Sequence, residues 1–303
     1  MSVETEVAER LDRYLIRRGF ASSRRVAAAL IAEGAVHVNG RRAQKGSVVA
    51  RGDRVEVQPA PDRTSIIANP NLTVAVLHEE PALLIVAKPG LLPCHPLKAT
   101  EDTTLLNFIA YRYPEAARPF AKPLEGGLVH RLDNGTSGTV MIARTAPAWQ
   151  RLRDALQAGQ IRRDYRALIV GHLSREYVIT TPLAHHRNPR KMTVAGARDA
   201  RPGGASRAAE TLVKPLRRYG DFTLVQVLPR TGRRHQIRVH LASIRHPIVG
   251  DTLYGGPPLA ELAAGRFWLH LQGLDLDSPA GGGRLQVDAP LAQDLRAALA
   301  RAG

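Results

Sequence analysis

The chain has 303 residues, of which 44% are hydrophobic and 23% are charged, as in soluble globular proteins. No apolar run approaches the roughly 20 residues that a membrane-spanning helix needs, and the first residues lack the basic and apolar regions of a secretory signal peptide. Cys94 is the one cysteine, so an intrachain disulfide is excluded. These features predict a cytoplasmic protein whose length allows two domains, one of them small.

The charge is strongly unbalanced: 43 lysines and arginines against 27 acidic residues give a net charge of +16 and a pI near 10.9. Such an excess favours a polyanionic partner, because cations that contact phosphates release bound counterions. Most of the basic residues are arginine, which forks onto phosphates and stacks on bases. Arginine usage also follows genome base composition, so the net charge is the stronger argument for binding of nucleic acid.

The N-terminal stretch predicts a small module of two helices and short strands. Apolar residues recur at helical spacing over residues 10–18 and 24–33, and each run is followed by a glycine. Ser22-Ser23 provides an N-cap for the second helix. Short alternating strands follow at residues 36–38 and 53–57, with a hairpin turn at Asn39-Gly40.

Arg24 and Arg25 fall in the first turn of the second helix, beside its free backbone N–H groups, where they could hold a phosphate. Taken alone, such a pair is more simply explained as solvated helix residues. The order of elements is more informative, since four segments resemble the S4 RNA-binding domain over its full length: Leu11-Asp12-Arg13, the helix start Ser23-Arg24-Arg25, Gly34-x-Val36-x-Val38-Asn39-Gly40 and Gly52-Asp53-x-Val55-x-Val57. The resemblance implies a domain at residues 10–58 that presents its two helices to structured RNA.

Residues 59–71 include three prolines among small and polar residues and are expected to form a linker. A larger domain is expected from residue 72 to residue 300. Its patterns predict, in chain order, strands at 73–78 and 83–88, helices at 103–111 and 148–156, strands at 161–171, 210–213 and 222–228, and a glycine turn that leads into a helix at 231–241.

Residues 126–144 contain the stretch best suited to chemistry. Two apolar runs, 128–129 and 140–143, flank a loop rich in turn formers, so the sequence predicts strand, exposed turn and strand with Asp133 at the tip. Rigid flanks and small residues favour a ligand site there. Asp133-Asn134-Gly135 is also ordinary turn chemistry, so these residues alone leave both explanations open.

The longer string His130-Arg131-Leu132-Asp133-x-x-Thr136-Ser137-Gly138 resembles the signature loop of the RluA family of pseudouridine synthases, in which the aspartate is catalytic. Two further strings are similar to that family's tyrosine-bearing strand and to its third motif, whose final arginine pairs with the aspartate: Tyr165-x-Ala167-Leu168-x-x-Gly171 and Thr231-Gly232-Arg233-x-His235-Gln236-Ile237-Arg238-x-His240-Leu241. Gly250-Asp251-x-x-Tyr254-Gly255-Gly256 also fits. The family's Lys-Pro loop is one residue shorter here, so Lys88 and His95 are expected only as neighbours of the site.

The resemblance implies isomerisation of uridine to pseudouridine in RNA, which needs no cofactor or metal, and the histidines and the cysteine show no metal-ligand spacing. Asp133 would attack C1′ of the ribose or remove the C2′ proton, and the sequence leaves both open. Tyr165 would stack on the uracil and could take the C5 proton. Arg238, beside an apolar helical stripe, would need a carboxylate partner and would orient Asp133. RNA contacts are expected from further residues of these motifs and of the small module: His130, Arg131, Thr136, Arg233, His235, Arg24 and Arg25.

The fold implied is α+β, with the small S4-like module followed by a catalytic domain of mixed, mostly antiparallel sheet, peripheral helices and a site in a basic cleft. Two other functions stay open: an S4-type RNA-binding protein without catalysis, and a hydrolase that uses Asp133. The first predicts loss of a motif residue, yet all are present; the second needs another water-activating carboxylate, which no motif supplies. Family members with an S4 module often modify large-subunit ribosomal RNA, so ribosomal RNA is expected before transfer RNA, and a monomer before an oligomer.

Overall fold

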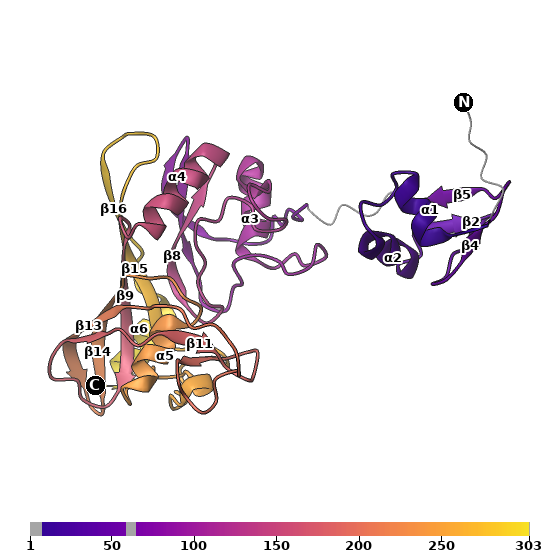
Figure 1. Cartoon of the computed structure of the whole chain (residues 1–303). Coiled ribbons are helices and arrows are strands. Elements are labelled where there is room, and N and C mark those ends of the chain that lie inside the picture. Colours follow the sequence, from indigo (N-terminus) through magenta and orange to yellow (C-terminus); the bar gives the residue numbers. More distant parts are fainter. Residues whose placement is uncertain (1–7, 59–64, 303) are drawn as a thin grey trace. The chain divides into compact units, whose positions relative to one another are not determined.

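The chain divides into two compact units, Met1–Arg63 and Thr64–Gly303, and the computed structural model describes residues 8–58 and 65–302 of them (Figure 1). Residues 59–64 of the predicted linker therefore lie outside the described residues. Residues 65–71 belong to the second unit, where the Asn107 side-chain amide donates to the Ile67 carbonyl at 2.7 Å and the Asn69 N–H donates to the Asn107 carbonyl at 3.1 Å.

The first unit holds helices α1 (Leu11–Arg17) and α2 (Arg24–Ala32). Its strands are short: β1 (Glu9–Arg10), β2 (Val36–Val38), β3 (Arg41–Arg42), β4 (Val48–Val49) and β5 (Val55–Val57). The predicted N-cap is confirmed, because the Ser23 hydroxyl accepts the Val26 N–H at 3.3 Å. The predicted hairpin turn at Asn39-Gly40 is also confirmed, since both residues have positive φ and join the paired strands β2 and β3.

The second unit is built on a nine-stranded sheet in which one neighbouring pair, β8 with β15, is parallel and the other pairs are antiparallel. The order is β10-β13-β14-β9-β15-β8-β7-β6, and β16 also pairs with β15. Its strands are β6 (Ala75–Glu80), β7 (Leu83–Lys88), β8 (Ser137–Ala143), β9 (Arg162–Val170), β10 (Tyr177–Ile179), β13 (Thr211–Tyr219), β14 (Phe222–Pro229), β15 (Leu269–Asp277) and β16 (Arg284–Asp288). The predicted α+β class with a mixed, mostly antiparallel sheet is confirmed.

Short elements complete this unit. They are helices α3 (Leu105–Arg112), α4 (Ala146–Gln157), α5 (Gln236–Ser243) and α6 (Gln293–Ala302), the 3₁₀ turns η1 (Pro114–Ala117) and η2 (Thr252–Tyr254), and the hairpin β11 (Leu183–His185) to β12 (Met192–Val194). Helix α4 begins two residues before the prediction, because Thr145 caps it by accepting the Ala148 N–H at 3.3 Å. The predicted strand at 128–129 is reduced to an isolated bridge between Leu128 and Ile142.

Two central strands position the candidate site. All seven residues of β8 are buried, as expected for a strand covered on both faces. In β9 the predicted alternation places Arg163, Tyr165, Ala167 and Ile169 on one buried face. The loop that carries Asp133 leads directly into β8, so the sheet fixes the base of that loop.

Candidate active site

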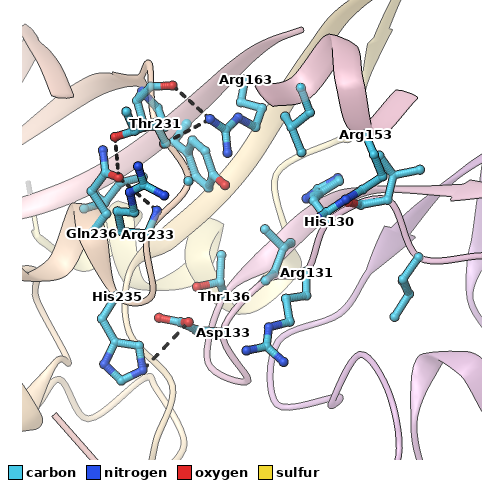
Figure 2. Close-up of a pocket in the computed structure, with 18 of the residues that line it drawn as sticks. His130, Arg131, Asp133, Thr136, Arg153, Arg163, Thr231, Arg233, His235 and Gln236 are labelled. Atoms are coloured by element: carbon cyan, nitrogen blue, oxygen red, sulfur yellow. Dashed lines mark hydrogen bonds and ion pairs between the residues drawn. The ribbon is translucent and has the colours of Figure 1, made fainter. Parts of the chain in front are cut away.

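A pocket of about 380 Å³ opens where the Asp133 loop, β9, the segment before α5 and helix α4 meet (Figure 2). It brings together every predicted site residue of the second unit, from segments far apart in the sequence: His130, Arg131, Asp133, Thr136, Tyr165, Arg233, His235 and Arg238. The expected neighbour His95 also lines it. Arg24 and Arg25 belong to the first unit, where both are exposed at the start of α2.

The centre of the site is an arginine held between two carboxylates. Arg238 Nη1 donates to Asp133 Oδ2 at 3.0 Å, which is the pair expected from the sequence. Its Nε and Nη2 donate to the two oxygens of Asp251 at 2.7 and 2.8 Å. Burial acts to lower the pKa of Arg238, but the hydrogen bonds and charges of Asp251 and Asp133 outweigh it and raise the pKa above its usual value. The guanidinium is therefore permanently charged and its position is fixed.

Aromatic rings complete the surroundings of this arginine. The guanidinium carbon of Arg238 lies 4.4 Å from the ring centre of Phe267 and 4.9 Å from that of Tyr254. The Tyr254 hydroxyl bonds His235 Nδ1 at 2.7 Å, and His235 Nε2 lies 3.9 Å from Asp133 Oδ1. Burial lowers the pKa of His235 to about 4, so this ring is neutral near pH 7. His235 thus borders the carboxylate as a polar group rather than as a second cation.

Sequence reasoning missed the roles of Asp251 and Tyr254. Their motif fits the family, but nothing in its spacing shows that Asp251 meets Arg238. The available signal was physical. A guanidinium beside an apolar helix stripe has N–H donors on three nitrogens, and one carboxylate cannot accept hydrogen bonds from all of them. That signal predicts a second acidic residue beside Arg238, and the structure identifies it as Asp251.

The Asp133 loop is held from below by backbone contacts. The Cys94 thiol accepts the Leu132 N–H at 3.3 Å and donates to the Leu132 carbonyl at 3.4 Å, one residue before Asp133. The Lys88 ammonium, 1% exposed, donates to the Pro89 and Leu92 carbonyls at 2.8 Å and to the Asn134 carbonyl at 3.4 Å. Burial lowers the pKa of Lys88 to about 8. Lys88 therefore supports the loop from beneath and does not line the pocket.

Tyr165 forms one wall of the pocket. Its side chain is 7% exposed, and its hydroxyl makes no hydrogen bond within residues 8–58 and 65–302. Burial raises the pKa of Tyr165 to about 12, so the phenol is protonated near pH 7. An aromatic face with an unbonded hydroxyl, beside Asp133, is suited to contact a planar base.

The remaining walls are basic. Arg153 of α4 donates to the Val129 carbonyl at 2.9 Å, and Arg163 of β9 lies two residues before Tyr165. No role was predicted for either arginine. His130 lines the pocket, but its Nε2 accepts the Met141 N–H at 3.2 Å. Burial lowers the pKa of His130 to about 3, so it is a neutral acceptor that ties the loop to β8. An RNA contact by His130 stays a prediction.

Comparison with solved structures supports this fold. The human protein named RNA Pseudouridylate Synthase Domain Containing 1 superposes with a TM-score of 0.60 at 24% identity, over 76% of this chain and 90% of the human one. A relative from Salmonella typhimurium named ribosomal large subunit pseudouridine synthase D is 32% identical over 96% of this chain and 90% of its own length. A Chloroflexus aurantiacus relative named uncharacterized RNA pseudouridine synthase is 36% identical over 97% of this chain and 90% of its own length.

Family profiles agree with these relatives. The RNA pseudouridylate synthase family matches residues 82–243, and the S4 domain matches residues 9–55. The chain therefore belongs to the RNA pseudouridylate synthase family, and it is an RNA pseudouridine synthase with an S4 domain at its N-terminal end. The prediction made from the signature loop is confirmed at the level of family and enzyme class.

The described residues include neither a membrane-spanning helix nor a cluster of metal-binding side chains. No helix among them is long and apolar enough to cross a membrane. Within residues 8–58 and 65–302, no three histidine, cysteine or acidic side chains lie close enough together to hold a metal ion.

Proposed function

We propose that this enzyme isomerises uridines of large-subunit ribosomal RNA to pseudouridine with Asp133 as its catalytic group. The single observation that carries the assignment is the Asp133 carboxylate, which is 25% exposed to the pocket and held by the buried Arg238. The RNA target is supported by the name of the Salmonella typhimurium relative and by the S4 domain. Transfer RNA is the alternative target.

In this proposal Asp133 acts on the ribose. The N1–C1′ bond breaks with its electron pair on the uracil, and Asp133 either bonds to C1′ or takes the C2′ proton. The uracil then turns and C5 bonds to C1′, while the Asp133–C1′ bond breaks or, in the other route, Asp133 returns its proton to C2′. The C5 proton leaves and N1 gains a proton. No atom is added or lost, so the step needs no other reactant. Arg238 fixes the direction in which Asp133 faces and does not itself react.

Tyr165 is proposed to stack on the uracil from the β9 wall. Because its pKa of about 12 keeps the phenol protonated, Tyr165 is no ready base in the free enzyme. If its oxygen receives the C5 proton, its own proton must leave in the same event. Stacking is therefore the contribution of Tyr165 that the structure supports best.

The cations at the pocket are proposed to receive the RNA backbone. Arg131 is exposed beside the loop, and Arg233 and Arg153 line the same opening (Figure 2). A uridine reaches this pocket only after it leaves its stack, which costs a few kcal/mol and costs least in loops and bulges. Thr136 is 2% exposed but lines the pocket, where it is proposed to contact the nucleotide. Arg24 and Arg25 would contact RNA through the first unit.

The division of labour between the units is part of the proposal. We assign RNA binding to residues 10–58 and chemistry to residues 72–300, joined by the predicted linker 59–71, of which residues 65–71 are held by the second unit. A tether of this kind raises the local concentration of RNA at the pocket. The enzyme is expected to act as a monomer in the cytoplasm, and sedimentation velocity with and without RNA tests the first expectation.

Tritium release from RNA labelled at uracil C5 tests the function. Unmodified ribosomal and transfer RNA are supplied separately to the wild type, to Asp133→Ala and to Asp154→Ala, which removes an exposed carboxylate from α4. We expect release from ribosomal RNA by the wild type and Asp154→Ala, and none above background by Asp133→Ala. Release from transfer RNA alone would show that transfer RNA, and not ribosomal RNA, is the substrate. Equal release by Asp133→Ala would refute the catalytic role.

A further inference from the structure

Arg163 is a buried cation without a carboxylate partner. Its side chain lines the pocket at 7% exposure. Its Nη2 donates to the carbonyls of Pro229 and Thr231 at 3.2 and 3.0 Å (Figure 2), and its Nε is buried without any hydrogen bond in the described part of the chain. No acidic side chain among the described residues pairs with it. A buried guanidinium usually has such a partner, since leaving one unpaired costs several kcal/mol.

The remaining nitrogen, Nη1, faces a gap left by a glycine. A Cβ atom on Gly232 would lie 3.1 Å from Arg163 Nη1, so any side chain at position 232 would cover that nitrogen. Gly232 is exposed, and its backbone N–H donates no hydrogen bond within the described ranges. Arg163 Nη1 and the backbone of Gly232 therefore lie close together in the pocket lining, each without a hydrogen-bond partner among the described residues.

The charges around this gap favour an anion. Arg153, Arg233 and Lys122 line the same pocket, whereas its acidic lining residues are Asp133 and Glu125. Asp133 is already bound by Arg238. The charge of Arg163 therefore meets no anion supplied by the protein, and a ligand with an anionic oxygen would supply the missing partner.

We propose that Arg163 Nη1 and the backbone of Gly232 form a seat for a phosphodiester oxygen of the RNA, next to the uridine that stacks on Tyr165. This inference rests on the proposed function, because it requires RNA in the pocket. In this arrangement Arg163 favours binding of a uridine that carries its phosphate. The phosphate contact also explains why the protein keeps a buried arginine that lowers its stability. Gly232 contributes by having no side chain.

Binding of full-length protein to unmodified large-subunit ribosomal RNA tests the seat, with the dissociation constant measured over a range of salt concentrations. Arg163→Met removes the cation, and Gly232→Ala keeps the cation but covers it. We expect each to weaken binding roughly 10- to 100-fold, as for a lost hydrogen bond to a charged group. The slope of log K against log salt should fall by about 0.7 to 0.9.

Arg162→Met is the matched control. It removes the same charge from the neighbouring residue of β9, whose side chain is 57% exposed on the opposite side of the strand, beside Asp164. Its dissociation constant and salt slope should stay close to those of the wild type. Thermal unfolding of each variant, followed by tryptophan fluorescence, identifies any loss of fold, and Gly232→Ala gives a second test if Arg163→Met does not fold.

The outcomes separate the seat from the function. If folded Arg163→Met and Gly232→Ala keep the wild-type affinity and salt slope but release tritium slowly, Arg163 contacts the uracil and the phosphate seat is wrong. If both variants bind like the wild type and turn over like it, Arg163 is structural and the seat is also wrong. A wild type that binds RNA but releases no tritium would refute the proposed function and leave the seat to be judged on affinity and salt slope alone.

Discussion

The two units of this chain present their charged side chains in contrasting ways. The first unit offers Arg24 and Arg25 on the surface of a short helix, where both are exposed and each can act without the other. The second unit places its charges inside: Asp133, Arg238 and Asp251 form one buried network in which every group depends on its neighbours. The contrast teaches that a substitution in the first unit should act locally and additively, whereas one in the second should disable the site as a whole.

The largest effect is expected from Arg238→Met. The change frees Asp133 to turn and leaves Asp251, 1% exposed, as a buried carboxylate without its partner. Breaking such a pair destabilises a protein by roughly 3–5 kcal/mol, and a reacting group misplaced by an ångström can slow a reaction about 100-fold. Tritium release and thermal unfolding measure the two losses separately.

A double variant distinguishes positioning from folding. Arg238→Met combined with Asp251→Leu removes the orphaned charge, so most of the lost stability should return. Turnover should stay low, because Asp133 still lacks the donor that orients it. Recovery of turnover together with stability would show that Arg238 acts only through folding, and the contrast between the units would weaken.

An intermediate effect is expected from acid. Burial lowers the pKa of His130 to about 3 and that of His270 to about 4, below the ordinary value near 6.5. Between about pH 6.5 and 4 the unfolded chain thus binds more protons than the folded one, and the free energy of unfolding falls as the solution is acidified. Trp149 and Trp268 both lie in the second unit, so tryptophan fluorescence follows its unfolding alone.

His130→Gln sharpens that measurement. The glutamine oxygen can accept the Met141 N–H in place of His130 Nε2, but it does not titrate. The melting temperature of this variant should fall less steeply with acidification than that of the wild type. An equal slope in both proteins would exclude His130 as a source of the acid sensitivity.

The smallest effect is expected in the first unit. Arg24→Gln and Arg25→Gln should each weaken RNA binding about two- to fivefold, as for single exposed phosphate contacts, and the double variant should show the product of both. The rate at saturating RNA should not change. Arg41→Gln, an exposed arginine of β3, is the matched control. A collapse of turnover in the double variant would mean that the two units do not work as separately as the comparison implies.

The predictable parts of the molecule are those set by local pattern or by a recognised motif. Alternation in β9 predicted the shared face of Arg163 and Tyr165, and the Ser23 cap predicted where α2 begins, because both depend on neighbours in sequence. The pairing of Asp133 with Arg238 spans 105 residues, so only the family resemblance could supply it.

Other contacts gave no such signal. Cys94 reaches the backbone of Leu132 across 38 residues, and nothing in its local sequence shows that its thiol supports the Asp133 loop. The orphaned Nε of Arg163 is a property of three-dimensional packing, which a strand pattern does not reveal. The residues that the family motifs name were foreseen, whereas the groups that hold them in place were not.

The Asp133 loop leads directly into β8, and this connection affects how the enzyme loses activity when it unfolds. β8 lies between β7 and β15 in the sheet, with every residue buried, and the His130 side chain is bonded to its backbone. Displacing β8 would require the central strands of the sheet to separate, so the backbone amides of β8 should exchange with solvent only through cooperative unfolding of the sheet. Heating should therefore end catalysis and melt the second unit in one event, with no folded but inactive species in between.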